Sequence, residues 1–397
     1  MLRIVIISNN NLAIKQSNNN IIMKNRIGIV GGGQLARMMI FEAKKLGFFV
    51  TVLDPTPNSP AGQVADKQIL ASLDDPKAMK TLAERSDFLT IEWEHANPEL
   101  LDILAKSGLS VNPSAKTLEI IKDKLIQKQF LTKYKIPVAP FRAVETKEDI
   151  EKAAEELGYP LVLKARVGGY DGKGNAVIKN KTQIDYALKK LNGKSLFVEG
   201  WVPFTKEVAV MVARNTKGEI KAHPVVETVH KNNICHTVFA PARVPKNILK
   251  KAEALGMEVM QVLKSAGIFG IEMFVTKQGK VLVNEIAPRV HNSGHYSMDA
   301  SLTNQFQQHI RAITGMPLGR TDLITPAVVM INILGTRTGP ADVKGLERTL
   351  AIPGVFVHIY GKAETKIERK MGHINAVGKS INDAWKKARS ARKYISI

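Results

Sequence analysis

The chain has 397 residues and a formal net charge of +21, and 44% of its residues are hydrophobic. This length predicts two or three domains, and the composition supports a large buried core and argues against intrinsic disorder. Cys235 is the only cysteine, which excludes an internal disulfide framework and fits a reducing cytoplasm.

The positive charge raises the hypothesis of a nucleic-acid partner, because such proteins concentrate Lys and Arg on one patch or stripe. Here the basic residues are spread along the chain, and only the tail KKARSARK forms a dense run. Aromatic residues, on which unpaired bases stack, make up only 6% of the chain. No apolar run reaches the ~18–20 residues that a membrane span needs. We therefore expect a cytoplasmic protein that binds phosphorylated small molecules, with neither nucleic acid nor membrane as a partner.

Residues 1–24 are rich in Asn and Ile and contain no acidic residue. We expect them to be an extension outside the fold, with Met23 as an alternative start. From residue 25 the chain alternates apolar strands with amphipathic helices: the pattern predicts strands over 26–30, 48–53 and 88–92 and helices over 34–46 and 79–83. This order predicts a parallel, doubly wound sheet.

Helical spacing then continues over 114–134 and predicts one long helix, after which Ile136-Pro137 starts an extended segment. Further on we expect strands over 160–166, 175–179 and 195–202 and helices over 183–191 and 248–266. From about residue 325 the pattern predicts short strands and turns with one terminal helix.

A glycine turn follows the first predicted strand. Gly31, Gly33 and Ala36 have the spacing of a dinucleotide-binding fingerprint, and Asp54 ends the next strand about 20 residues later, where such an acid would hold a ribose hydroxyl. The fingerprint is weak, because any phosphate at a helix N-terminus needs small residues at this turn. A tight turn without a ligand is the alternative.

A second glycine-rich segment favours nucleotide binding more strongly. Lys164 ends the strand PLVLKAR, and the loop GGYDGKG, with four glycines in seven residues, follows closely. The backbone N–H groups of such a loop can meet phosphate oxygens, and the lysine adds a point charge. The alternative is an ordinary flexible hairpin. No Gly-Lys-Ser/Thr opens a helix here, so the loop is not a Walker loop.

A pair of carboxylates predicts a metal site. GIEMFVT and KVLVNEIAP flank a turn at Gln278-Gly279, and a two-residue hairpin loop there places Glu272 directly opposite Glu285. Facing carboxylates repel each other, but Mg²⁺ is typically held by one or two carboxylates together with substrate phosphates. Asn284 adds a third oxygen donor. A solvated edge pair is the alternative, which the apolar neighbours disfavour.

The motifs that carry a family resemblance are GIVGGGQLARM, TIEWEHA, KDKLIQKQFL, GGYDGKG, NEIAPRVHNSGH and RKMGHIN. With them the chain from about residue 25 onward resembles the 5-(carboxyamino)imidazole ribonucleotide synthetases, which are ligases with the ATP-grasp fold. NEIAPRVHNSGHYS together with RKMGH is specific within the ATP-grasp group. The resemblance implies ATP- and bicarbonate-dependent carboxylation of the amino group of 5-aminoimidazole ribonucleotide, through carboxyphosphate, in purine biosynthesis.

The resemblance also assigns a nucleotide site. The ATP phosphates would be held by Lys124 and Lys164 under a loop formed by Gly169, Tyr170, Asp171, Gly172, Lys173, Gly174 and Asn175. The adenine and ribose would be held by the hinge Glu199, Gly200, Trp201 and Val202, by Glu207 and by the nearby His230. The Mg²⁺ ions would be bound by Glu272 and Glu285, with Asn284 beside them.

The other substrates are assigned in the same way. Bicarbonate and carboxyphosphate would be handled by Arg289, His291 and Asn292, with His291 as a proton carrier near neutral pH. The phosphate of the ribonucleotide would be gripped by Lys362, Arg369 and Lys370. Its sugar or imidazole would be held by Gln34, Glu92, Tyr170 and Asp171. Without the resemblance, the C-terminal cations would be interpreted as a solvated face.

The implied fold is mixed α/β and α+β: an ATP-grasp fold with an N-terminal Rossmann-like parallel-sheet domain and a small C-terminal β-rich domain. The expected boundaries are 1–24 for the leader, 25–122 for the N-terminal domain, 123–320 for the ATP-grasp domain and 321–397 for the C-terminal domain. The implied cofactors are ATP and Mg²⁺, with neither biotin nor NAD, and the implied assembly is a homodimer. Ala36 departs from the family, which often has Gly there, and Lys124 and Lys366 stand where it often has Arg.

Three other interpretations compete with this one. A NAD-dependent dehydrogenase would use the first glycine turn but leaves Glu272, Glu285 and the second glycine loop without a role. A basic RNA-binding protein lacks a recognisable nucleic-acid module. A sister ATP-grasp ligase that uses another acid, such as formate, is the strongest alternative.

Overall fold

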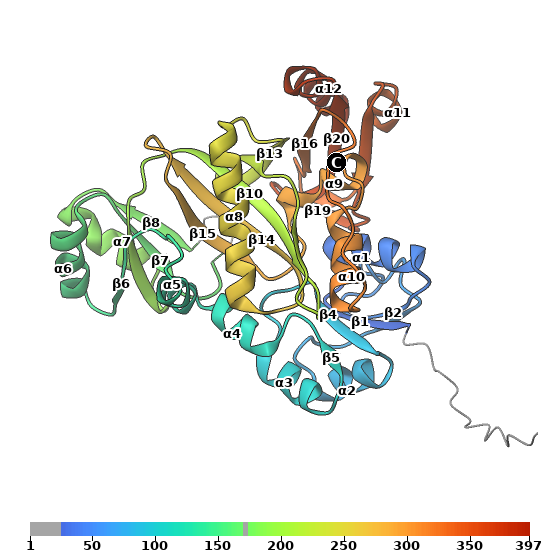
Figure 1. The fold of residues 1–397 in the computed structure, drawn as a ribbon, viewed down its shortest axis with the longest axis horizontal. Coiled ribbons are helices and arrows are strands. Elements are labelled where there is room, and N and C mark those ends of the chain that lie inside the picture. Colours follow the sequence, from blue (N-terminus) through green and yellow to red (C-terminus); the bar gives the residue numbers. More distant parts are fainter. Residues whose placement is uncertain (1–24, 170–173) are drawn as a thin grey trace, which may run out of the picture.

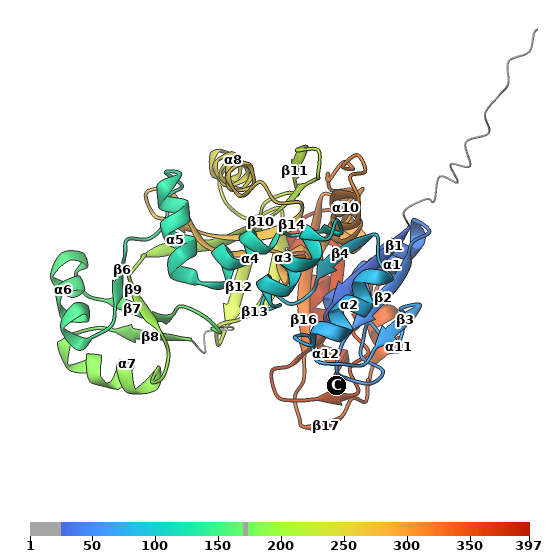
Figure 2. The same ribbon diagram turned by 90° about the horizontal axis from the view of Figure 1, so that it is seen from below.

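The computed structural model describes residues 25–169 and 174–397, and three of the four sheets in these residues lie side by side (Figure 1). The predicted leader, 1–24, and the middle of the predicted glycine loop, 170–173, lie outside the described residues. A small antiparallel sheet stands at one end of the molecule and an N-terminal parallel sheet at the other, with a long sheet between them (Figures 1 and 2).

The N-terminal sheet has the predicted parallel topology. Its strand order is β3-β2-β1-β4-β5, and every neighbouring pair is parallel. The strands are β1 (Arg26–Val30), β2 (Phe49–Leu53), β3 (Lys67–Ile69), β4 (Phe88–Ile91) and β5 (Ser110–Val111). The helices of this region are α1 (Gln34–Lys45), α2 (Pro76–Glu84), α3 (Pro98–Lys106) and α4 (Ala115–Lys122). The strands β3 and β5 and the helix α3 were not predicted.

The predicted single helix over 114–134 is wrong. The structure has α4 and then α5 (Lys124–Lys133), separated at Asp123, whose backbone is extended. The carboxylate of Asp123 accepts hydrogen bonds from the backbone N–H groups of Leu125 and Ile126, and it pairs with Arg166 at 2.6 Å. Apolar spacing runs through this break, whereas the capping aspartate marks where the second helix starts.

The small sheet has the order β6-β9-β7-β8 and is antiparallel throughout. Its strands are β6 (Phe141–Val144), β7 (Leu161–Ala165), β8 (Asn175–Ile178) and β9 (Leu196–Gly200), accompanied by α6 (Lys147–Leu157) and α7 (Ile184–Lys190). Apolar residues of these strands and helices form a core of their own. This sheet places Lys164 at the end of β7 and Glu199 near the end of β9.

The long sheet has the order β15-β14-β10-β12-β13-β16-β20-β18, and β11 also pairs with β10. Its strands are β10 (Phe204–Arg214), β11 (Ile220–Ala222), β12 (Val226–Lys231), β13 (Ile234–Ala240), β14 (Gly267–Thr276), β15 (Val281–Ala287), β16 (Ala327–Leu334), β18 (Val355–Ile359) and β20 (Lys370–Gly378). Because β16 pairs with β13, one sheet runs without a break across the expected boundary at residue 320. The C-terminal strands are also longer than predicted, since β16 has eight residues and β20 nine.

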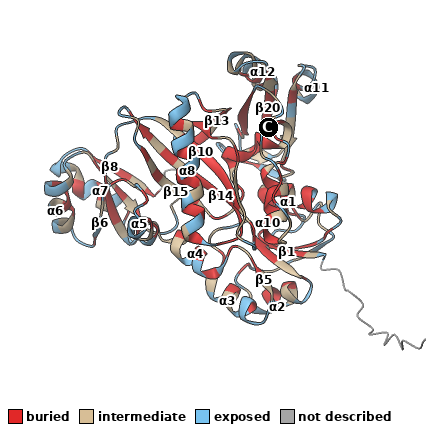
Figure 3. Ribbon diagram, in the orientation of Figure 1, coloured by how far each residue is buried: buried red, intermediate tan, exposed pale blue. Residues whose placement is uncertain are grey.

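Helices cover the long sheet and join it to the N-terminal region. α8 (Lys246–Leu263) packs on β10 and β14, and α10 (Gln305–Ile313) packs on β14, on β10 and on α1. α12 (Ile381–Tyr394) covers β16 and β20, and α9 (Ser297–Ala300), α11 (Leu346–Leu350), β17 (Gly339–Pro340) and β19 (Glu364–Thr365) complete the C-terminal half. Buried residues concentrate in β10, β14 and β1 and in the helix faces turned toward them (Figure 3).

Candidate active site

A cavity of about 960 Å³ is lined by residues of the small and the long sheets. Most of the residues predicted for the site line it: Gln34, Lys124, Lys164, Gly169, Gly174, Asn175, Glu199, Gly200, Trp201, Val202, Glu207, His230, Glu272, Asn284, Glu285, Arg289, His291, Asn292 and Lys370. Among the described residues, the predicted Glu92, Lys362 and Arg369 do not line it. Tyr170, Asp171, Gly172 and Lys173 lie outside the described residues.

The predicted carboxylate pair is confirmed, although the hairpin differs from the one expected. Glu272 on β14 pairs directly with Glu285 on β15. The hairpin loop has three residues rather than two, since the N–H of Thr276 bonds to the carbonyl of Lys280 and Gly279 adopts φ +71°.

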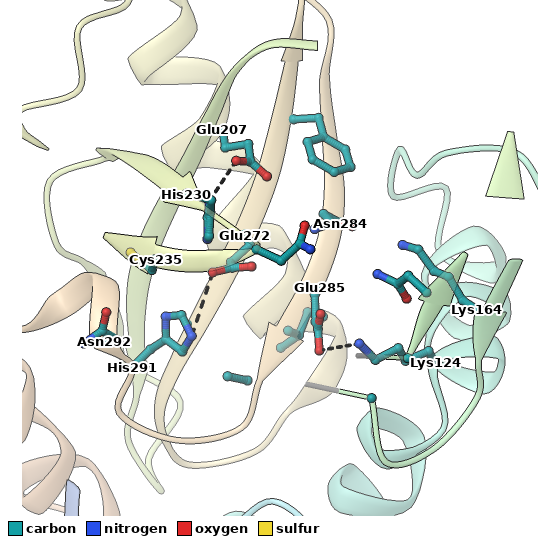
Figure 4. A pocket seen from close by; sticks show the side chains of 18 of the residues that line it. Lys124, Lys164, Glu207, His230, Cys235, Glu272, Asn284, Glu285, His291 and Asn292 are labelled. Atoms are coloured by element: carbon teal, nitrogen blue, oxygen red, sulfur yellow. Dashed lines mark hydrogen bonds and ion pairs between the residues drawn. The ribbon is translucent and has the colours of Figure 1, made fainter. Parts of the chain in front are cut away.

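A β-bulge corrects the register. Met273 pairs with Val283 and Glu272 with Glu285, so Asn284 is the extra residue. A bulge turns consecutive side chains to one side of the strand, and both Asn284 and Glu285 line the cavity. The bulge therefore brings an amide and two carboxylates together, as Figure 4 shows.

The two carboxylates have different electrostatic surroundings. Burial and the neighbouring Glu285 raise the pKa of Glu272 to about 7, although the positive charge of His230 opposes them. Burial would also raise the pKa of Glu285, but Lys124, whose ammonium lies 2.9 Å from Oε1, lowers it. Glu285 therefore stays ionised, whereas Glu272 is only partly ionised near pH 7, and a bound divalent cation would favour its ionised form.

These residues fit a magnesium ion. Carboxylate and amide oxygens are its preferred protein ligands, and Mg²⁺ takes its remaining ligands from phosphates and water. Nowhere in residues 25–169 and 174–397 do three or more His, Cys, Asp or Glu residues gather as a complete metal site. Glu272, Glu285 and Asn284 thus suit an ion that a bound nucleotide helps to hold.

Two lysines face this pair, one from the start of α5 and one from the small sheet (Figure 4). Lys124 is the first residue of α5, and its backbone N–H bonds to the carbonyl of Arg166 at 2.8 Å. Lys164 at the end of β7 forms an ion pair with Glu199. On its other oxygen, Glu199 pairs at 2.7 Å with Lys128, a buried residue that sequence reasoning missed. Lys128 follows Lys124 by one helical turn, and this spacing was the available signal.

On the opposite wall, Glu207 of β10 and His230 of β12 form a hydrogen bond of 2.8 Å between Oε2 and Nδ1. Burial would lower the pKa of His230, but the hydrogen bond and the charge of Glu207 outweigh it and raise this pKa. The predicted nucleotide residues Glu207 and His230 therefore act as one polar unit.

The segment after β15 carries Arg289, His291 and Asn292. Arg289 pairs with Glu94, which follows β4 in the N-terminal region and was not predicted. Nδ1 of His291 hydrogen-bonds to Ser293 at 2.8 Å. Burial, followed by the charge of Arg289, lowers the pKa of His291 well below its usual value, so its imidazole is neutral at physiological pH. The expectation of a proton carrier that titrates near neutrality is therefore corrected.

Asn292 is held by a second asparagine. Its amide nitrogen donates to Oδ1 of Asn332 at 3.0 Å, and the amide of Asn332 donates back at 2.7 Å. Asn332 lies on β16 and was not predicted. This reciprocal pair holds Asn292, and with it the neighbouring His291, against β16.

The first glycine turn binds carboxylates of the chain itself. The N–H of Gly32 donates to Asp54 at 2.7 Å, and the N–H of Gly33 and of Leu35 donate to Glu92. Glu92 leaves no room for a Cβ at Gly33. Asp54 and Glu92 therefore fill the place that the fingerprint reserves for a pyrophosphate, and both carboxylates hold this turn; a substrate role of Glu92 stays a prediction.

The predicted C-terminal cations lie close to one another. The ammonium of Lys362 donates to the carbonyl of Lys370 at 2.7 Å, and Arg369 donates to the carbonyl of Glu364 at 2.7 Å. Burial, together with the charges of Arg369 and Lys370, lowers the pKa of Lys362 to about 8 although Glu92 opposes them. The three cations thus form a cluster that an anion would stabilise.

Comparison with known families matches three segments of the chain. The ribonucleotide synthetase preATP-grasp domain matches residues 23–122, the ATP-grasp domain 129–306, and the phosphoribosylaminoimidazole carboxylase C-terminal domain 328–387. The N5-carboxyaminoimidazole ribonucleotide synthase of Bacillus subtilis is 42% identical, and the match covers 90% of this chain and 93% of that protein. The chain belongs to the N5-carboxyaminoimidazole ribonucleotide synthase family.

Solved structures of this family have the same fold. The synthetase from Thermotoga maritima is 47% identical, with a TM-score of 0.85 over 94% of this chain and 99% of that one. The Aspergillus clavatus enzyme in complex with ADP and 5-aminoimidazole ribonucleotide is 35% identical, with a TM-score of 0.87 over 94% of this chain and 98% of that one. The predicted ATP-grasp fold with an N-terminal parallel sheet is confirmed.

The chain spans about two thirds of the length of the fungal phosphoribosylaminoimidazole carboxylases that it also matches. As an ATP-grasp ligase of this family, it is not a dehydrogenase, and the family match does not favour a sister ligase that uses another acid. In the described part of the chain, no helix combines the length and the apolar character that crossing a bilayer requires.

Proposed function

We propose that this chain uses ATP to carboxylate the amino group of 5-aminoimidazole ribonucleotide with bicarbonate, giving N5-carboxyaminoimidazole ribonucleotide, ADP and phosphate. The observation that carries the proposal is the cavity in which Glu272, Asn284 and Glu285 face the ammonium groups of Lys124 and Lys164. Paired carboxylates opposite lysines suit a metal-bound triphosphate, because both kinds of charge are then balanced.

Within this proposal the nucleotide lies between the small and the long sheets. Lys124 and Lys164 contact its phosphates, the segment 169–175 covers them, and the hinge 199–202 holds the adenine. Glu207, fixed by His230, accepts hydrogen bonds from the ribose hydroxyls. Glu272, Glu285 and Asn284 would hold Mg²⁺, which, when bound, neutralises charge on the transferring phosphoryl group.

Bicarbonate is a poor electrophile and needs activation. One of its oxygens attacks the γ-phosphorus, the bond from phosphorus to the ADP oxygen breaks, and carboxyphosphate forms. Carboxyphosphate releases phosphate and CO₂, and the amine nitrogen bonds to the CO₂ carbon and loses a proton. Arg289, oriented by Glu94, stabilises the anionic oxygens. The neutral imidazole of His291 lines the same cavity and can hydrogen-bond to these oxygens.

The ribonucleotide enters from the side of the N-terminal region in this proposal. Lys362, Arg369 and Lys370 bind its phosphate, and Gln34, at the start of α1, contacts its sugar or imidazole, together with Tyr170 and Asp171. The resemblance also leads us to propose a cytoplasmic homodimer, which light scattering during gel filtration would test.

An ADP-release assay tests the function. With Mg-ATP and bicarbonate, we expect ADP release to rise strongly on adding 5-aminoimidazole ribonucleotide and to stay low with glycinamide ribonucleotide. Replacing bicarbonate with formate should abolish the stimulation. Equal or greater stimulation by formate would assign the chain to another acid, and equal thermal stabilisation by NAD and Mg-ATP would refute nucleotide specificity.

A further inference from the structure

A buried lysine outside the cavity pairs with a residue of the nucleotide site. The side chain of Lys128 is only 3% exposed, and its ammonium lies 2.7 Å from Oε1 of Glu199. It also donates to the carbonyl of Val283 at 3.4 Å. Among the described residues that line the cavity, Lys164 is present and Lys128 is absent. Lys128 is therefore placed to act through Glu199 rather than on the nucleotide.

Glu199 carries one negative charge between two lysines. Lys128 lies at Oε1 and Lys164 at Oε2, and the carboxylate is only 4% exposed. Burial would raise the pKa of Glu199, but Lys164 and Lys128 lower it to about 2. The three groups together thus hold two positive charges and one negative charge, which leaves a surplus of one positive charge on the side that faces the cavity.

That surplus depends on Lys128. In a medium of low dielectric constant, a carboxylate with a single cationic partner holds it tightly. If Lys128 were absent, the remaining Glu199 and Lys164 would form an ion pair with no net charge. Lys164 would then have to leave its ion-pair partner Glu199 to bind a phosphate.

We propose that Lys128 is a positioning residue that neutralises Glu199, so that Lys164 keeps its positive charge available for the nucleotide phosphates. The inference rests on the proposed use of ATP at this site. It predicts that the phosphates, and not the adenosine part, lose affinity when Lys128 loses its charge.

The test compares ADP with adenosine in binding titrations of the full chain. Lys128→Met keeps the length of the side chain and removes its charge. Because Lys164 would lose a charged hydrogen bond to the phosphate, we expect the dissociation constant for ADP to rise about tenfold or more. Binding of adenosine should change by less than about threefold. Equal weakening of both ligands would show damage to the hinge and overturn the proposal.

A second substitution separates charge balance from simple support. In a Glu199→Gln background no carboxylate competes for Lys164, so adding Lys128→Met should change ADP affinity by less than about threefold relative to Glu199→Gln alone. Two losses of structural support would instead weaken binding further. If Lys128→Met does not fold, the comparison of the double variant with Glu199→Gln decides, and ADP binding more than tenfold weaker in the double variant overturns the proposal.

The chain offers a matched control. Glu227 is also a buried carboxylate with two cations, Lys206 at 2.6 Å and Arg243 at 2.7 Å, and none of the three lines the cavity. Lys206→Met should leave ADP affinity unchanged, and a loss equal to that in Lys128→Met would overturn the proposal. If the wild type binds neither ADP nor ATP, the proposed function itself fails. If it binds both and Lys128→Met binds them equally well, only this inference fails.

Discussion

Raising the pH should weaken binding of the ribonucleotide through Lys362. This lysine is half-buried beside Arg369 and Lys370, and its pKa is lowered to about 8. The phosphate of the ribonucleotide has a second pKa near 6, so its own charge is constant above pH 8. Below pH 8 the lysine is charged and can bind the phosphate, and above pH 8 the free enzyme loses this charge. The KM for the ribonucleotide should therefore rise about tenfold between pH 7 and pH 9.

Initial rates measured between pH 7 and pH 9.5 check this prediction. The KM for ATP should change little over the same range, because other residues hold the nucleotide. Lys362→Met should have a raised KM for the ribonucleotide that no longer depends on pH in this range, whereas Lys379→Met, at an exposed site, should behave as the wild type. A pH profile of Lys362→Met with the same tenfold rise would show that another group titrates and would refute the reasoning.

Three further predictions follow from the site and its surroundings. Glu285→Gln should lower the rate of ADP release at least about a hundredfold while the melting temperature stays within a few degrees, because the metal site loses a charged ligand. Glu272→Gln should raise the Mg²⁺ concentration needed for the half-maximal rate. Full activity of Glu285→Gln at low Mg²⁺ would disprove the metal assignment. Glu94→Gln should lower kcat about ten- to a hundredfold with little change in the KM for ATP, since Arg289 loses a charged partner; an unchanged kcat would contradict this orienting role. His223 is fully buried, has no hydrogen-bond partner among the described side chains, and has its pKa lowered to about 3 by burial. As the pH drops below 6.5, the unfolded chain therefore takes up a proton at this histidine before the folded chain does, and the free energy of unfolding falls. His223→Leu should therefore lose about 1.3 kcal/mol less unfolding free energy than the wild type between pH 7 and pH 5.5 in urea titrations, and an equal loss would count against it.

The sequence predicts those parts of the site that depend on local pattern. The alternation of β14 and β15 around a glycine turn was enough to pair Glu272 with Glu285. It could not reveal that a longer loop and a bulge at Asn284 compensate for each other, because both change the register by one residue in opposite directions. The helix break at Asp123 was missed for a related reason: apolar spacing continues through it, and only the capping side chain marks it.

The pairing of residues with partners distant in sequence was not predictable. Lys128, Glu94 and Asn332 each hold a site residue that comes from another part of the chain. In the sequence they have the appearance of an ordinary helix lysine, a loop acid and a strand asparagine. Burial and pairing are what distinguish them, and these exist only once the sheets are assembled.

The first glycine turn shows how one local pattern can serve two purposes. In parallel sheets the carboxyl ends of the strands form the edge where ligands bind. Here the segment after β4 places Glu92 on the N–H groups of the turn and Glu94 on Arg289. The two acids are two residues apart in the turn that follows β4. One of them fixes the start of α1, and hence Gln34, while the other orients Arg289. The strand edge that would hold a dinucleotide phosphate thus helps to position Gln34 and Arg289, which both line the cavity.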